Sequence, residues 1–466
     1  MNEILTKIND VMYTYVLIVL LAGVGIYFTI RTKGVQLRLF KDAIRSLMEK
    51  AGTGTDGKKK VSSFQALMIS TASRVGTGNI AGIATAIAAG GPGAVFWMWV
   101  MAVIGGASAF VESTLAQIYK VKDGEGFRGG PSYYMEKALG KRWLGILFSV
   151  LLIICFAYGF NGLQSFNMSS SLEYYIPGYS ETIYPIIVGA VLAIGTALVI
   201  FGGVHRIGFI TSVLVPVMAG SYLLIGLYTI ITNISELPHV FSMILSQAFD
   251  FQAFAGGMAG SAVVIGIKRG LFSNEAGMGS APNASASAAV SHPAKQGMVQ
   301  VLSVFIDTLL ICSATAMMLL LSGVEGKTGV LDGIPFVQKA VSANVGNWGI
   351  HFITLSIFAF AFSSLIGNYY YAESNILFIK NNKKLLFVFR ITCILAVFFG
   401  AQADFSMMWN IADITMGCMA TVNIIVILIL GNKAIRVLKD YEKQKKEGKD
   451  PVFSAKDAGI DNADCW

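Results

Sequence analysis

The sequence predicts an all-α protein that crosses a membrane many times. Hydrophobic residues make up 55% of the 466 residues and charged residues only 13%, whereas ordinary soluble domains carry roughly 25% charged residues. The mean hydropathy is +0.64. Apolar runs of about 20 residues, the length of a transmembrane helix, recur along the chain. These observations exclude an ordinary soluble domain and favour a polytopic helical membrane protein.

Hydropathy predicts about eleven transmembrane helices. We expect them near residues 11–30, 62–89, 94–119, 143–172, 182–201, 207–231, 242–267, 297–322, 349–379, 385–402 and 406–431. The polar segment Met1–Asp10 precedes the first span, and no A-x-A cleavage site follows it. We therefore expect a retained first helix and not a signal peptide.

Loop charges predict the orientation of the chain in the cell membrane. Residues 31–60 and 120–142 are rich in Lys and Arg, and Lys268-Arg269 extends this pattern after the seventh span. The loops 90–93 and 173–181 lack this excess of positive charge. The positive-inside rule then places the N-terminus outside and the C-terminus in the cytoplasm. The same rule accounts for the net charge of +8 without a nucleic-acid partner.

Three segments outside the spans have their own character. An amphipathic helix on the inner surface is expected around Leu37–Met48. Residues 327–345 are typical of an outer loop with a helical piece, Ile334–Val341. The tail, Lys433–Trp466, mixes Lys, Glu and Asp, and we expect its last part to be disordered.

A polar break interrupts the second span at Ser73-Arg74-Val75-Gly76-Thr77-Gly78-Asn79. Its glycines lie about 15 residues into the span, near the middle of the bilayer. Unwinding at 75–78 leaves free C=O groups, which suit Na⁺, and free N–H groups, which suit a carboxylate. Asn79 adds a side-chain oxygen. The alternative is a small-residue packing face, but packing does not explain Arg74 and Asn79 at this depth.

A second break is expected in the seventh span, at Phe254–Ser261, where glycines again fall near mid-depth. The two breaks then lie in oppositely directed helices, as an inverted repeat predicts. We expect an extra helix with the amphipathic segment at 1–61, repeats at 62–241 and 242–432, and a charged tail at 433–466. The alternative is a break in the next segment, Gly270–Pro282, which is too polar for lipid contact.

Other polar residues lie inside the predicted spans. Asn161 and Gln164 share one helix face, and they either bind substrate or form an interhelical hydrogen bond. Asp307 lies about ten residues into the eighth span and needs a cation or a donor, either a Na⁺ ion or Arg74. We group Arg74 and Asp307 with Asn274 and Glu275 as candidates for coupling or gating.

Three stretches carry a resemblance to a known family. They are Gly91-Pro92-Gly93-Ala94-Val95-Phe96-Trp97-Met98-Trp99 with Gly105-Gly106, Gly270–Pro282, and Ala412-Asp413 with Met416-Gly417. Together they resemble the alanine or glycine:cation symporter (AGCS) family over nearly the whole chain. The resemblance implies eleven helices with a leucine-transporter-like (LeuT-like) five-plus-five core. It also implies Na⁺-coupled uptake of a small neutral amino acid, typically alanine or glycine, while some relatives prefer glutamine.

The Val75–Asn79 run is similar to the first core helix of the wider LeuT-like superfamily. This match implies that the N–H groups of Thr77 and Gly78 meet the substrate carboxylate, and that Asn79 serves a Na⁺ site or the substrate. It further implies a second Na⁺ site. That site would be formed by the carbonyls of Ala72 and Val75 and the hydroxyls of Ser363 and Ser364.

We therefore expect a Na⁺/small neutral amino acid symporter that works by alternating access in the plasma membrane, and not an enzyme. Phe254, Gly256, Gly257 and Met258 are expected to bound the pocket for the substrate side chain. The alternatives are a glutamine-preferring symporter and H⁺ coupling through Asp307. The sequence contains no GxxxxGK[ST] motif, and its cysteines and histidines are scattered, so we expect neither ATP hydrolysis nor an organic cofactor.

Overall fold

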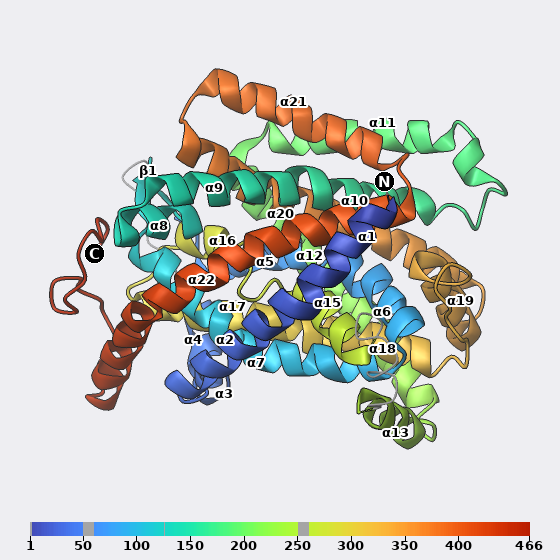
Figure 1. The fold of residues 1–466 in the computed structure, drawn as a ribbon, viewed down its shortest axis with the longest axis horizontal. Helices are drawn as coiled ribbons and strands as arrows, with labels where there is room; N and C mark the ends of the chain where they lie inside the picture. Colours follow the sequence, from blue (N-terminus) through green and yellow to red (C-terminus); the bar gives the residue numbers. More distant parts are fainter. Residues whose placement is uncertain (1, 50–59, 125, 250–260) are drawn as a thin grey trace.

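The computed structural model describes residues 2–49, 60–124, 126–249 and 261–466 and shows a bundle of helices (Figure 1). At the start of the chain, α1 (Asn2–Val11), a π-helical stretch (Met12–Leu17) and α2 (Ile18–Arg31) follow one another without a loop. They cross the long helix α22 diagonally (Figure 1). Two short helices, α3 (Val35–Arg38) and α4 (Phe40–Leu47), confirm the helical segment expected around Leu37–Met48.

The second predicted span is helical on both sides of a break. α5 (Ser63–Arg74) begins at Ser62 with a capping box, in which Ser62 and Gln65 exchange side-chain to backbone hydrogen bonds. After the break, a π-helical turn (Gly78–Gly82) leads into α6 (Ile83–Gly90). The break expected at 75–78 is therefore confirmed at 75–77.

The rest of the first half contains four long helical segments and a small insertion. The elements are α7 (Gly93–Ile118), β1 (Val121–Asp123), β2 (Gly126–Arg128), α8 (Pro131–Leu139), α9 (Arg142–Leu152), a π-helical stretch (Ile153–Phe160), α10 (Asn161–Ser170), a 3₁₀ turn (Tyr179–Glu181), α11 (Tyr184–Ile200) and α12 (Gly203–Thr232). The two strands pair antiparallel.

The second half repeats the order of a broken helix followed by long helices. The elements are α13 (Leu237–Ala248), α15 (Ala262–Asn274), α16 (Pro282–Ser287), α17 (Pro293–Phe305), a π-helical stretch (Ile306–Cys312), α18 (Ser313–Leu320), α19 (Gly333–Val345), α20 (Trp348–Ile379), α21 (Lys383–Gly400) and α22 (Phe405–Lys446). α19 contains the helical piece expected at Ile334–Val341.

The described residues of the expected seventh span, 242–267, belong to two separate helices. α13 ends at Ala248, and α15 starts separately after Ser261, whose hydroxyl accepts a hydrogen bond from the Val264 N–H. Lys268 and Arg269 were expected in a loop, but they lie within α15 and Arg269 is buried. Both pair with Asp413 of α22. Burial of Arg269 beside the partly exposed Lys268 is possible because the carboxylate compensates their charge.

The two broken helices lie antiparallel to each other. α15 packs against α6 and the π-helical turn, whereas α16 packs against α5. The first half of each broken helix therefore meets the second half of the other, and the two breaks lie at the same level. This arrangement fits the inverted repeat, while the boundaries 62–241 and 242–432 stay a prediction.

The ends of the bundle differ in character (Figure 1). The N-terminus, α13 and α19 lie at one end, and β1, α8, α3, α4 and the C-terminus lie at the other.

Seven helices of the described part are long and apolar enough to cross a membrane, and Gly78–Gly90 and Tyr184–Ile200 are shorter apolar helices. The count of eleven spans thus stays a prediction. Large apolar side chains such as Leu198 and Phe399 are exposed on the outer helices, where a bilayer would cover them.

The end of the tail is ordered against the rest of the protein, so the expectation of disorder is wrong. The Trp466 indole donates a hydrogen bond to the Gln117 carbonyl, and the Phe453 N–H donates to Ser291 O. Phe453, Ile460 and Ala463 are buried. These apolar residues are widely spaced among charged ones, so the composition of the tail conceals them.

Candidate functional site

The first break is held open by side chains. The Gly76 N–H donates to Asn79 Oδ1 (2.9 Å), and the Thr77 N–H donates to Gln164 Oε1 (3.0 Å). A Cβ on Gly76 would lie 2.2 Å from Ser364 Oγ, so only glycine fits here. The backbone groups that leave the helix are thus paired with side chains from α10 and α20 and from the break itself.

The second break lies at 275–281, which is the alternative position that the sequence left open. Its first residue, Glu275, adopts the left-handed conformation (φ 53°). The N–H groups of Gly277 and Gly279 donate to the Glu112 carboxylate of α7 at 3.2 and 3.0 Å. Phe254–Ser261, the position first expected, lies outside the described residues except for Ser261.

A cluster of buried polar side chains joins the two broken helices, and we call it the Asn79 cluster: Asn79, Ser273, Asp307 and Thr308. Asn79 Nδ2 donates to Asp307 Oδ1 at 2.6 Å. The hydroxyls of Ser273 and Thr308 donate to Asp307 Oδ2 at 2.7 and 2.9 Å. All four side chains are buried. The Asp307 carboxylate and the two hydroxyl oxygens are ligands of the kind that a hard cation prefers, whereas Asn79 presents its amide nitrogen to the carboxylate.

A second group of oxygens gathers at the end of α5. Ser364 Oγ donates to the carbonyls of Ala72 (3.0 Å) and Val75 (3.3 Å). Ser363 does not join them, because its hydroxyl bonds to Phe360 O (2.8 Å) within α20 and lies 3.5 Å from Met218 Sδ. The structure thus brings together three of the four residues that the superfamily match groups around a second ion.

A chain of hydrogen bonds connects both breaks to α10 and α20. Asn368 of α20 donates to Asn161 Oδ1 (3.0 Å) and accepts from Ser73 Oγ (2.7 Å). Ser73 also lies 3.2 Å from the Glu275 carboxylate, which accepts from Ser280 at 2.5 Å. Asn161 and Glu275 therefore belong to one network that contacts both broken helices. Gln164 meets the first break directly.

Arg74 is buried beside this network and forms no ion pair at contact distance with any residue that the structure describes. Its Nη1 lies 3.4 Å from Gln300 Oε1, and its Nε and Nη2 have no hydrogen-bond partner among the described residues. It does not bond to Asp307, which binds Asn79 instead. Asn274 bonds through Oδ1 to the Ala276 N–H (3.0 Å), while its Nδ2 is unpartnered in the described structure.

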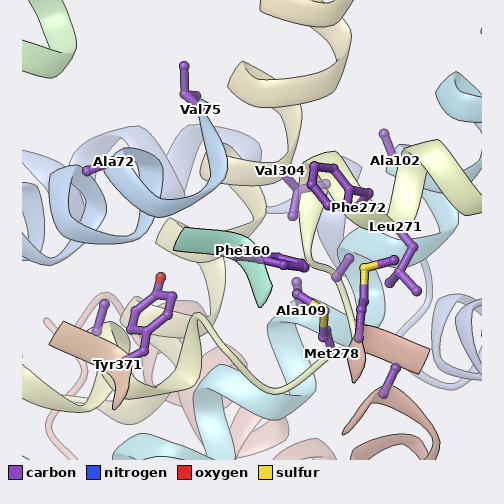
Figure 2. Packing of buried hydrophobic residues seen from close by; sticks show 14 of the residues in the cluster. Ala72, Val75, Ala102, Ala109, Phe160, Leu271, Phe272, Met278, Val304 and Tyr371 are labelled. Atoms are coloured by element: carbon purple, nitrogen blue, oxygen red, sulfur yellow. The ribbon is translucent and has the colours of Figure 1, made fainter. Parts of the chain in front are cut away.

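Aromatic side chains pack around the break. The ring centroids of Phe160 and Phe272 lie 4.8 Å apart, and the ring centroid of Trp409 lies 5.1 Å from that of Phe272. Figure 2 shows Phe160 and Phe272 within the packed interior that also contains Ala72 and Val75. A Cβ on Gly78 would approach Phe272 to 2.8 Å. The space beside the second half-helix is therefore narrow and apolar.

The structure sorts the expected site residues into three sets. It gathers Thr77, Gly78, Asn79 and Gln164 with Asp307 at the break, and Ala72, Val75 and Ser364 beside it. Phe254, Gly256, Gly257 and Met258 lie outside the described residues. Ser273, Thr308 and Asn368 were not predicted from the sequence, because a single Ser, Thr or Asn in an apolar span more often bonds within its own bundle.

Comparison with known proteins gives a consistent result. The family model described as "Sodium:alanine symporter family" matches residues 1–455. The chain is 50% identical to "Amino-acid carrier protein AlsT" of Bacillus subtilis (100% of this chain, 97% of the relative). It is 48% identical to "Probable sodium/glutamine symporter GlnT" of the same organism (100% and 97%). It is 36% identical to "Sodium/alanine symporter AgcS" of Methanococcus maripaludis (95% and 98%).

Two solved structures share the fold. MhsT in complex with L-phenylalanine aligns with a TM-score of 0.54 at 15% identity and covers 84% of this chain and 90% of its own. The manganese transporter of Eremococcus coleocola aligns with a TM-score of 0.54 at 14% identity over 87% and 85%. The helical arrangement is therefore that of the LeuT-like transporters, as the sequence analysis expected.

Proposed function

The chain belongs to the sodium:alanine symporter family, whose members are membrane transporters and not enzymes, and on that premise we propose that its site lies between the two helix breaks. The protein couples amino acid transport to Na⁺. The observation that carries the proposed position is the Asn79 cluster, which joins both broken helices through one buried carboxylate.

The first proposed Na⁺ site is the Asn79 cluster. The amide N–H of Asn79 now presents positive charge to Asp307, and a Na⁺ ion would take that position while the amide turns its oxygen toward the ion. Ser273 and Thr308 would add hydroxyl oxygens. Asp307 supplies the compensating negative charge, which a cation at this depth requires.

The second proposed Na⁺ site is formed by Ala72 O, Val75 O and Ser364 Oγ. The Ser364 hydroxyl hydrogen now faces both carbonyls. A Na⁺ ion would replace that hydrogen and bind all three oxygens. These carbonyls belong to the C-terminal end of a half-helix, whose dipole favours a cation.

The proposed substrate position is the start of the second half-helix. The Thr77 N–H now donates to Gln164 Oε1, and the substrate carboxylate would displace this amide oxygen. Gly78 would provide the neighbouring N–H. Phe272 lies so close to Gly78 that even a Cβ there would clash, so this wall favours a small side chain such as that of alanine or glycine.

Alternating access would follow from the paired breaks. Each break separates two half-helices, which can tilt about residues that lack helical hydrogen bonds. Binding of Na⁺ and substrate would connect both breaks and favour their joint movement. We place the N-terminus outside and the C-terminus in the cytoplasm, supported by the Lys/Arg-rich loops 31–60 and 120–142.

Two alternatives concern what is carried. A preference for glutamine is favoured by the relative named as a probable sodium/glutamine symporter, at 48% identity. H⁺ coupling through Asp307 is favoured by its position in the Asn79 cluster. Glutamine has a longer side chain than alanine, so the position of Phe272 favours alanine over glutamine as the substrate.

The test is uptake of radiolabelled alanine into proteoliposomes. We expect uptake with an inward Na⁺ gradient, and none when K⁺ replaces Na⁺. A pH gradient alone should not drive uptake if Na⁺ is the coupling ion. A competition panel of glycine, serine and glutamine then ranks the substrates. Equal uptake in K⁺ without a pH gradient would refute the Na⁺ proposal.

Asn79→Ala tests the position of the site. The variant removes the amide that links Gly76 and Asp307, so we expect the loss of Na⁺-dependent binding and uptake. Asn167→Ala is the matched control, because the Asn167 amide is also buried but donates only to Leu163 O of its own helix. Wild-type uptake by Asn79→Ala would contradict the assignment.

A further inference from the structure

The residues after α22, Glu447–Trp466, form a segment that folds back along the end of the bundle, and we call it the strap. It begins on α22 itself, where Gln444 exchanges hydrogen bonds with the Val452 backbone at 2.9 and 3.0 Å. Arg436 holds the middle of the strap by donating to Ala458 O and Gly459 O. The strap then continues toward α8 (Figure 1).

The far end of the strap is attached to α7 and α8. The Trp466 indole donates to Gln117 O (2.8 Å), and its ring lies 4.4 Å from the Lys120 ammonium. The Phe127 ring lies on Lys120 at 4.1 Å. Asp464 pairs with Lys137, and the Asn462 amide donates to Lys137 O (3.1 Å). Lys120 is thus enclosed between two aromatic rings.

The first part of the strap, residues 450–453, is attached to the loop between α16 and α17. The Phe453 N–H donates to Ser291 O (2.9 Å), and Ser291 Oγ donates to Pro451 O (2.9 Å). The Phe453 ring packs against the rings of His292 and Trp466, with centroid distances of 5.4 and 5.5 Å. Asp450 accepts from the buried Lys295 of α17 (3.1 Å). One segment therefore contacts both sides of this loop.

The same loop leads directly from α16, the second half of the second broken helix. Gln117 binds the end of α16 through Ser285 O and Ala288 O, and Lys120 also donates to Ala288 O (3.2 Å). Gln117 thus bonds to α16 through its side chain and to Trp466 through its backbone. Movement of α16 away from α7 must disturb the residues that the strap covers.

We propose that the strap docks on α7, α8 and the 288–292 loop and holds the end of α16 against α7, so that opening at this end of the transporter requires its release. The partner that this surface fits is a segment of the chain itself. The contacts support this because they connect the strap to α7 and to the loop that follows α16, the half-helix that begins at the second break. A strap that only packed on α22 would have no such effect.

A reversible cross-link tests the strap. Lys137→Cys and Asp464→Cys are introduced after Cys418 and Cys465, which are not buried, are replaced by Ser. A short bis-maleimide with an internal disulfide joins the pair and a reducing agent cleaves it. We expect the cross-linked protein to lose about tenfold or more in alanine exchange and to recover after cleavage. The single variant Lys137→Cys with the same reagent is the control. Unchanged exchange by the cross-linked protein would overturn the proposal.

A second measurement does not depend on the substrate. Ser287→Cys places a thiol at the buried end of α16, where N-ethylmaleimide reacts only when this end opens. We expect the cross-link to slow its modification and Phe453→Ala to accelerate it by about tenfold. Val452→Ala is the matched control, since the neighbouring Val452 is exposed. Equal rates in all variants would refute the strap even if alanine is not the substrate. An absence of alanine exchange before cross-linking would refute the proposed substrate alone.

Discussion

Single side chains in this protein act through partners that their sequence neighbours do not share. Ser363 and Ser364 are adjacent, buried and chemically identical. Only Ser364 meets the carbonyls of the first break, because successive residues of a helix point about 100° apart. The proposed second Na⁺ site therefore depends on one hydroxyl, and the pair provides its own control.

We predict that Ser364→Ala raises the Na⁺ concentration for half-maximal alanine uptake by about tenfold or more, because the ion loses one of three oxygens. Ser363→Ala should change it by less than about twofold, because its hydroxyl bonds within α20. The measurement is the Na⁺ dependence of uptake in proteoliposomes. Equal effects of the two changes would contradict the assignment of Ser364.

Asp413 shows how a buried charge is stabilised in this bundle. Its carboxylate accepts from Arg269 (2.7 and 3.2 Å) and lies 2.7 Å from Lys268 Nζ. It also accepts from Asn9 of α1 (3.2 Å). We predict that Asp413→Asn destabilises the protein by about 3–5 kcal/mol, because two cations lose their counter-charge.

Thermal unfolding in detergent measures this effect. Replacing Lys268 and Arg269 by Gln in the Asp413→Asn background removes the stranded charges and should recover part of the loss. A single variant as stable as the wild type would show that the carboxylate is not needed to hold the two cations.

At the scale of elements, the broken helices show why the breaks occur where they do. The first break contains Gly76, whose hydrogen atom faces Ser364 and Gln164. The second break begins at Glu275 and is held by Glu112 through the N–H groups of Gly277 and Gly279. In each case, side chains from neighbouring helices satisfy backbone groups that no water reaches.

We predict that Gly76→Ala lowers Na⁺-dependent uptake by at least about tenfold, because the new Cβ would displace Ser364 and Gln164 from the break. Gly220→Ala is the control, since nothing lies within 4 Å of a Cβ at that position. Binding and uptake of alanine are measured for both. Equal binding and uptake by the two variants would show that the close contact of Gly76 with Ser364 and Gln164 is not needed for transport.

At the scale of the whole molecule, different elements cover the two ends of the bundle. α13 and α19 lie at one end, whereas the strap, α8 and the β1–β2 hairpin lie at the other (Figure 1). Lys120 contacts the end of the strap at the Trp466 ring. Burial lowers the pKa of Lys120 to about 7, while Cys465 opposes this shift and Lys60 adds to it.

We predict that docking of the strap strengthens as the pH rises above about 7, toward the usual lysine pKa of about 10.4. The sign follows from proton counting. The docked state has the lower pKa of Lys120 and binds fewer protons in this window, so that alkaline pH favours it. Below about pH 7 both states are protonated and no further change is expected.

A nitroxide attached to Asp461→Cys, at an exposed position of the strap, reports by electron paramagnetic resonance whether the strap is docked. Its mobile fraction should fall from about pH 7 to about pH 9, and Lys120→Met should remove the dependence. The same pH dependence in Lys120→Met would assign it to another group.

The membrane class, the first break and the family could be predicted from the sequence, because these follow from local properties. A bilayer excludes unpaired backbone groups, so an Arg and an Asn beside two glycines at mid-depth predict a break from a few neighbouring residues. The position of the second break at 275–281, the pairing of Lys268 and Arg269 with Asp413, the contact of Ser273 with Asp307 and the course of the strap appear only in the tertiary structure. Each depends on partners more than 30 residues away, such as Asp307 for Ser273 and Asp413 for Arg269. A polar side chain in an apolar span is costly until such a partner is present, and the local sequence does not say where that partner lies.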